Sequence, residues 1–123
     1  MKRRYKRDDR LHVPMPQIPK DLLNNPSIAQ VLLATVEEFY HEEKSAIYMY
    51  CLAEMSVREI ARLTEQPIPY VMAVLRMYAY RLAFKVDVFE KILKKGTYVK
   101  VPVRVLFELE SEKWAQMQRD NDI

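Results

Sequence analysis

Residues 55–82 carry hydrophobic side chains at the spacing of two short helices. The first helix would bury one face, formed by Val57, Ile60 and Leu63. Ser56 and Glu59 have the spacing of a capping box, in which each side chain accepts a hydrogen bond from the other residue's backbone amide. This pattern predicts a helix that begins directly after Ser56.

Residues 65–69 would separate the two helices, because Pro67 and Pro69 each lack an amide donor and have a fixed φ. Proline is accepted in the first turn of a helix, so the second helix would begin at one of these two prolines. Its buried face would be formed by Val71, Leu75, Tyr78 and Leu82. Two helices joined in this way form a helix-turn-helix unit, expected at about residues 56–84.

The preceding region is also helical in pattern. Asn25 followed by Pro26 predicts the start of a helix that runs to about His41. Its buried positions would be Ile28, Leu32, Val36 and Phe39. A further helix within residues 43–54 would support the helix-turn-helix, and the pattern leaves open whether the two helices are continuous.

The region after Leu82 keeps its apolar side chains at helical spacing, either as one long helix or with a break at Asp87. Gly96 would occupy the position just beyond the helix end. Valines that alternate from residue 99 to residue 105 are typical of a strand, whereas Pro102 is a good helix start. We expect a short extended segment and then a helix over about residues 102–119.

The N-terminal region has a different character. Residues 1–10 contain six basic side chains. Prolines at 14, 16 and 19 predict an extended segment that lies along the surface or links the arm to the body. The chain would therefore consist of a flexible basic and proline-rich arm (1–20), a helical domain (21–96), and an extended segment with a C-terminal helix (97–123). The expected fold class is all-α, a small helical bundle that contains a helix-turn-helix.

Composition fits one such domain. Half of the 123 residues are hydrophobic, and a single glycine leaves few turns at positive φ, which favours helices over hairpins. A single cysteine, Cys51, excludes an internal disulfide. No apolar stretch approaches the ~18 residues of a membrane span, and no secretory signal is recognisable. We expect a cytoplasmic protein that does not contact a membrane.

The sequence offers no constellation for catalysis. His12 and His41 lack a second histidine or cysteine at metal-ligand spacing, and Cys51 lies in an apolar stretch. No glycine-rich phosphate loop and no nucleophile–base pair is present. The acidic residues around His41 would face two sides of a helix, as solvated side chains do. We therefore expect neither an enzyme nor a bound metal or cofactor.

The charge is distributed in segments, although the net charge is only +3. Residues 1–20 hold seven Lys or Arg against two Asp, and residues 55–100 hold nine against four acids. Residues 21–54 hold one lysine against six acids. The basic excess therefore coincides with the arm and the helix-turn-helix, as in nucleic-acid-binding proteins, although solvated helix faces would also give this pattern.

The run Ile60-Ala61-Arg62-Leu63, with Val71 and Leu75 after it, resembles the helix-turn-helix of region 4 in bacterial sigma factors and related response regulators. The resemblance covers about residues 42–84. The chain departs from the family pattern in the turn, where the family commonly has glycine, a small apolar residue and serine, and this chain has Glu65, Gln66 and Pro67.

The resemblance implies that the second helix lies in the major groove of double-stranded DNA and that the protein is a small stand-alone transcription regulator. The residues expected to face the groove are Ile68, Pro69, Tyr70, Met72, Ala73 and Arg76. Arg76 is the one among them that can make a bidentate contact with guanine. Phosphates would be held by Arg58, Arg62, Arg81, Lys85, Lys94, Lys95, Arg3, Arg4, Lys6 and Arg7.

A second interpretation is a protein-interaction module on a helix-turn-helix scaffold that no longer reads DNA. The outward surface expected for the second helix is apolar, as buried partner surfaces are, and consists of Ile68, Pro69, Met72, Ala73 and Met77. The partner would be a second copy of the chain, RNA polymerase or another regulator. The two interpretations differ in salt dependence, because only phosphate contacts weaken steeply with ionic strength.

Overall fold

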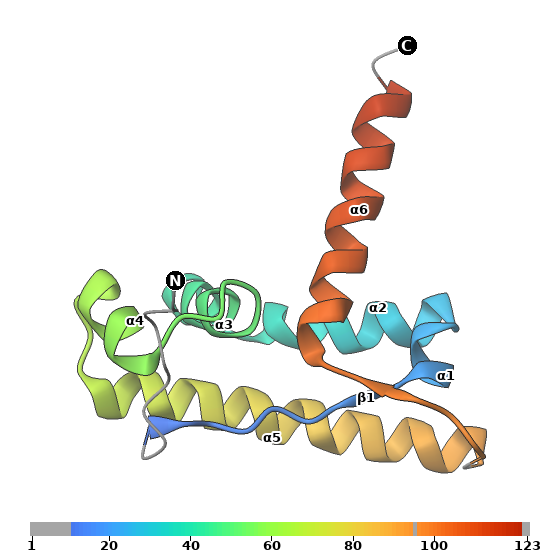
Figure 1. Cartoon of the computed structure of the whole chain (residues 1–123), viewed down its shortest axis with the longest axis horizontal. Helices are drawn as coiled ribbons and strands as arrows, with labels where there is room; N and C mark the ends of the chain where they lie inside the picture. Colours follow the sequence, from blue (N-terminus) through green and yellow to red (C-terminus); the bar gives the residue numbers. More distant parts are fainter. Residues whose placement is uncertain (1–10, 95, 122–123) are drawn as a thin grey trace, which may run out of the picture.

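The computed structural model describes residues 11–94 and 96–121, and this part of the chain is mostly helical, as predicted (Figure 1). The elements in chain order are β1 (Ile18–Pro19), α1 (Lys20–Leu23), α2 (Pro26–Ala34), the 3-10 helix η2 (Thr35–Glu38), α3 (His41–Cys51), α4 (Val57–Thr64), α5 (Ile68–Leu93), β2 (Lys100–Val101) and α6 (Val103–Asn121).

The helix that starts at Asn25 ends earlier than predicted. The Asn25 side-chain oxygen accepts hydrogen bonds from the backbone amides of Ser27 and Ile28, which confirms the predicted cap. After Ala34 the chain tightens into η2, and Phe39 is extended. The backbone amide of Tyr40 donates to Glu43 Oε1 at 2.9 Å, so α3 has its own start. The prediction of one helix to His41 is therefore wrong.

α4 starts as predicted, but its buried face differs by one position. The amide of Glu59 donates to Ser56 Oγ at 3.1 Å, and the amide of Ser56 donates to Glu59 Oε1 at 3.4 Å, which completes the capping box. Val57 and Ile60 are buried with Ala61, whereas Leu63 is exposed. Positions i, i+3 and i+4 set the buried face of this short helix, and Leu63 lies on its flank.

The turn between α4 and α5 is left-handed at Glu65, with φ 57° and ψ 39°. Glu54 and Lys94 also have positive φ. A non-glycine residue in this conformation costs about 1–2 kcal/mol. Scarcity of glycine therefore did not keep positive φ out of the turns. Gly96 was predicted to end α5 with a positive φ. Instead Lys94 follows the last residue of α5 with φ 62°, and Gly96 has no positive φ.

α5 is the longest described helix, with 26 residues and no break at Asp87. Its predicted buried face is confirmed, since Val71, Leu75, Tyr78 and Leu82 are all in the core. α3 and α4 pack on it, and so do α2 and η2. α5 is thus the common support of the domain.

Residues 11–19 pack against the helical body through a few buried side chains, although His12, Pro14 and Gln17 are exposed. Val13 and Ile18 are buried, and the Val13 amide donates to the hydroxyl of the buried Tyr50 at 2.9 Å. β1 pairs antiparallel with β2, with Ile18 opposite Val101. The basic residues 1–10 lie outside the described residues.

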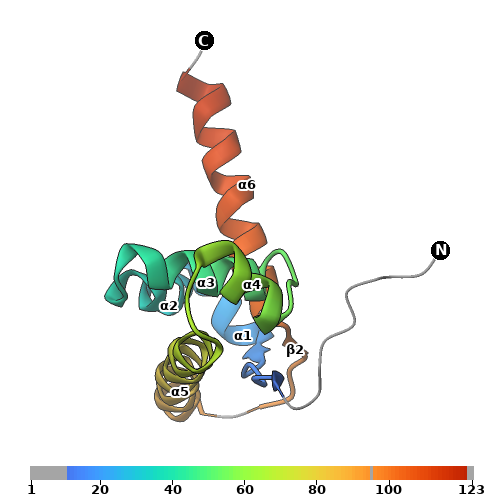
Figure 2. The same ribbon diagram turned by 90° about the vertical axis from the view of Figure 1, so that its left-hand side faces the viewer.

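The C-terminal region follows the prediction of a short extended segment and then a helix. α6 packs through Val103, Leu106 and Phe107, and the Phe107 ring contacts Tyr48 edge-on with centroids 5.0 Å apart. Beyond this base α6 projects from the body, and it stands away from α5 (Figures 1 and 2). It therefore leaves the outward face of α5 uncovered.

Candidate nucleic-acid interface

The start of α5 is held by two other helices. α3 packs against both α4 and α5, and α4 packs against α5. Only residues 65–67 separate α4 from α5. Figure 2 faces this end of the molecule, where α4 lies beside the start of α5. The three helices form one packed unit that presents the first half of α5 at the surface.

The outward face of this half of α5 carries Pro69, Tyr70, Ala73, Arg76 and Met77, which are all exposed. Met72 is only 5% exposed, so the expectation that it faces outward is wrong. Consecutive helix residues are about 100° apart, so Met72 joins the core next to Val71 while Ala73 points away. Ile68 is half-buried. Arg76 remains the candidate for base contact.

Arg58 and Arg62 are exposed on α4, four residues apart and hence on one side of that helix. Acidic groups lie near the same end of the molecule. Burial raises the pKa of Tyr70, and the carboxylates of Glu43 and Glu42 on α3 raise it further. The surface around the start of α5 is therefore mixed in charge.

Arg81 and Lys85, two predicted phosphate contacts, are bound to Glu38 of η2. Arg81 Nη1 lies 3.3 Å from Glu38 Oε1, and Lys85 Nζ is paired with the other carboxylate oxygen. The Arg81 guanidinium also lies 4.7 Å from the centroid of the Phe39 ring. These contacts hold both cations on the side of α5 that faces η2.

The hydrogen bond from Lys85 lowers the pKa of Glu38, burial opposes this shift, and the charges of Lys85 and Arg81 lower the pKa further. A lowered folded-state pKa stabilises the fold above the ordinary value of 4.5, and this contribution disappears as the pH falls through the folded-state pKa.

Glu38→Gln should therefore lower the free energy of unfolding at pH 7 by about 0.5–1 kcal/mol, a small effect because the three side chains are partly exposed. The difference from the wild type should shrink as the pH falls below 4.5 and through the lowered pKa of Glu38. Urea denaturation over a pH series from 7 downward measures this. A difference that stays constant over the series would show that the charge of Glu38 is not what stabilises the contact.

The remaining predicted phosphate contacts are distant from Arg76 or outside the described residues. Lys94 is exposed just beyond the end of α5, about 27 Å along the helix axis from Arg76. Lys95 and the arm residues lie outside the described residues; the latter are Arg3, Arg4, Lys6 and Arg7. The structure thus gathers Arg58, Arg62, Tyr70, Ala73 and Arg76 at one end of the molecule.

One surface was missed by the sequence interpretation. From the middle of α5 onward, large apolar side chains are exposed at helical spacing, namely Met77, Tyr80, Phe84 and Val88. Their spacing of three, four and four residues is itself helical, so the sequence carries a signal for a second apolar face. We call these four residues the α5 stripe.

None of the helices in the described ranges combines the length and the apolar character of a membrane span. Comparisons of the chain with protein-family models, with curated proteins and with solved structures find no match.

Proposed function

We propose that α3, α4 and α5 form a DNA-binding helix-turn-helix unit and that the protein is a transcription regulator. The observation that carries the proposal is the exposure of Ala73 and Arg76 on the first half of α5 while α3 and α4 pack behind it. A small side chain at Ala73 lets the helix approach the base edges closely. Arg76 then donates two hydrogen bonds to a guanine.

Phosphate contacts in this proposal come from α4 and the N-terminal arm. Arg58 and Arg62 would bind the backbone beside the groove, and residues 1–10 would add attraction that does not depend on sequence. Arg81 and Lys85 contribute less, because Glu38 already neutralises part of their charge.

The test is the binding of labelled duplex DNA across a series of salt concentrations. We expect affinity to fall steeply with salt, and the double variant Arg58→Ala/Arg62→Ala to reduce the logarithmic salt slope by about 2. A protein lacking residues 1–10 should also show a shallower slope.

Arg76→Ala should weaken binding to a selected sequence by about 5- to 150-fold. Lys91→Ala removes one positive charge from the far half of α5 and is the matched control. It should change the affinity for the selected sequence and for random DNA by the same factor. Absence of binding at low salt would refute the proposal.

A second candidate function is favoured by the α5 stripe. A contiguous exposed apolar face is typical of protein-binding surfaces. In this alternative the α5 stripe binds RNA polymerase or another regulator. Binding would persist at high salt and would be lost in Phe84→Glu, whereas DNA binding would not depend on Phe84. Capture of purified RNA polymerase by the wild type and the variant separates the two functions.

A further inference from the structure

The C-terminal half of α6 projects from the body and is exposed on all sides. The whole helix has 19 residues, about 28 Å in length, and every residue from 111 to 121 is exposed. Trp114 and Met117 are 54% and 52% exposed on this projecting part. A free helical segment of this length is marginally stable in water, and large apolar side chains on it favour a partner.

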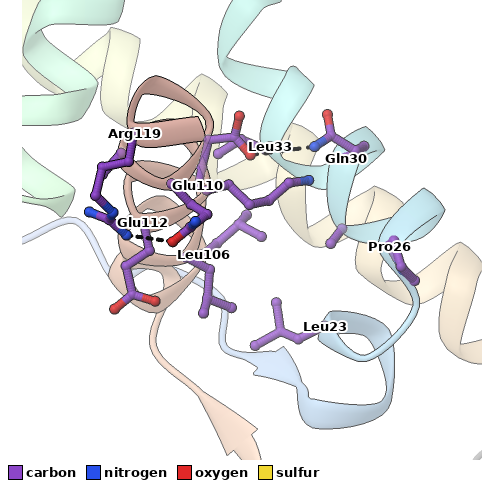
Figure 3. A pocket seen from close by; sticks show the side chains of 13 residues that line it. Leu23, Pro26, Gln30, Leu33, Leu106, Glu110, Glu112 and Arg119 are labelled. Carbon is purple, nitrogen blue, oxygen red and sulfur yellow. Dashed lines mark hydrogen bonds between the residues drawn. The ribbon is translucent and has the colours of Figure 1, made fainter. Parts of the chain in front are cut away.

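A groove lies in the angle between α6 and the helices at its base (Figure 3). Its volume is about 820 Å³, and its apolar lining consists of Leu23, Ala29, Leu33, Leu106 and Leu109. Trp114 lies beside a second hollow on the other side of α6, together with Tyr48, Leu52 and Phe107. The projecting half of α6 thus exposes two large apolar side chains. The groove at its base is also uncovered, and its lining combines leucines with polar and charged side chains, namely Gln30, Glu110, Glu112, Lys113, Gln116 and Arg119.

The side chains of α6 match a second, antiparallel copy of the same helix. Leu106, Glu110, Lys113 and Met117 follow one another at spacings of four, three and four residues, which places them on one seam. They are also symmetric about the point between Ser111 and Glu112. An antiparallel partner therefore sets Glu110 against Lys113 twice. It also brings Met117 of each copy to the base of the other α6, where Leu106 is only 2% exposed and lines the groove. A parallel partner would set like charges against each other.

We propose that α6 of a second copy of the chain lies antiparallel in this groove, so that two chains form a closed twofold dimer. One surface supplies both the groove and the helix that fills it, as an isologous interface requires. Glu110 stands at the rim, where its carboxylate accepts a hydrogen bond from Gln30 Nε2 at 3.4 Å. The dimer does not depend on DNA binding, and its formation is measured without DNA.

The first test is the mass of the full-length protein in solution, by light scattering or sedimentation over about 1–200 µM. We expect twice the chain mass of 14.7 kDa. Met117→Glu should shift the protein to the monomer. Gln118→Glu adds the same charge at the next position, about 100° around the helix from the seam, and should remain dimeric.

The second test uses charge reversal at the seam. Lys113→Glu and Glu110→Lys should each weaken self-association about tenfold or more, because each places like charges opposite one another. An equimolar mixture of the two variants should associate again, because both cross-helix pairs are then of opposite charge. This restoration cannot result from a folding defect.

Two results would overturn the proposal. A wild-type protein that is monomeric over the whole range excludes the dimer. A dimer that survives Met117→Glu, together with variants that do not complement each other, places the contact elsewhere. Failure of DNA binding alone would leave the dimer intact.

Discussion

Met72→Glu will lower the free energy of unfolding by about 3 kcal/mol or more, whereas Ala73→Glu will change it by less than about 1 kcal/mol. Met72 lies in the hydrophobic core, so a glutamate there is buried without a partner or must be protonated at a cost. Ala73, the next residue, is exposed on the outward face of α5. The pair thus measures which face of α5 is buried.

Urea denaturation of the two variants and the wild type is the measurement. Near-equal stabilities of the two variants would mean that Met72 is accessible. The outward surface of α5 would then include Met72, as the hydrophobic pattern of the sequence suggested.

Tyr50→Phe and Tyr78→Phe remove the same hydroxyl from two buried side chains, 1% and 0% exposed, and should change stability in opposite directions. The Tyr50 hydroxyl accepts from the Val13 amide and lies 3.1 Å from His12 Nδ1. Its removal leaves a buried amide without an acceptor, and we expect a loss of about 1–3 kcal/mol.

The Tyr78 hydroxyl is different, because it is buried and has no hydrogen-bond partner among the described residues. Burial raises the pKa of this hydroxyl far above its ordinary value. Tyr78→Phe should therefore raise the free energy of unfolding by about 1–3 kcal/mol. Thermal and urea unfolding of both variants measures the two signs. A loss of stability in Tyr78→Phe would mean that its hydroxyl does have a partner.

The predictions that the structure confirms are those that depend on neighbouring residues. The caps at Asn25 and Ser56 need only the next few amides, and the buried face of α5 repeats over many turns. The extended segment and helix after residue 99 follow from Pro102 in the same way. Local chemistry was sufficient for these elements.

The wrong predictions concern contacts between distant parts of the chain. Leu63 and Met72 are both apolar, and their burial depends on where α3 and α5 pack, which local spacing does not specify. The proline-rich segment is held against the body in part because β1 pairs with β2, which lies about eighty positions further along the chain. No pattern within the proline-rich segment indicates that partner.

The same limit applies to the candidate site. The residues of the α4–α5 hairpin come together because they are close in sequence, as Arg58, Ala73 and Arg76 illustrate. The pairing of Arg81 and Lys85 with Glu38 spans 43 and 47 residues. The charge distribution along the chain suggested that both cations bind DNA. Only the fold shows that they form ion pairs with Glu38 of η2.

The most direct test of the DNA-binding proposal compares Ala73→Glu with Ala83→Glu in duplex-DNA binding. Both alanines are exposed on α5, and both variants add one negative charge to the same helix. If the first half of α5 enters the groove, Ala73→Glu should lower affinity about tenfold or more, and Ala83→Glu less than about threefold. Equal losses, or no loss in Ala73→Glu, would contradict the proposal.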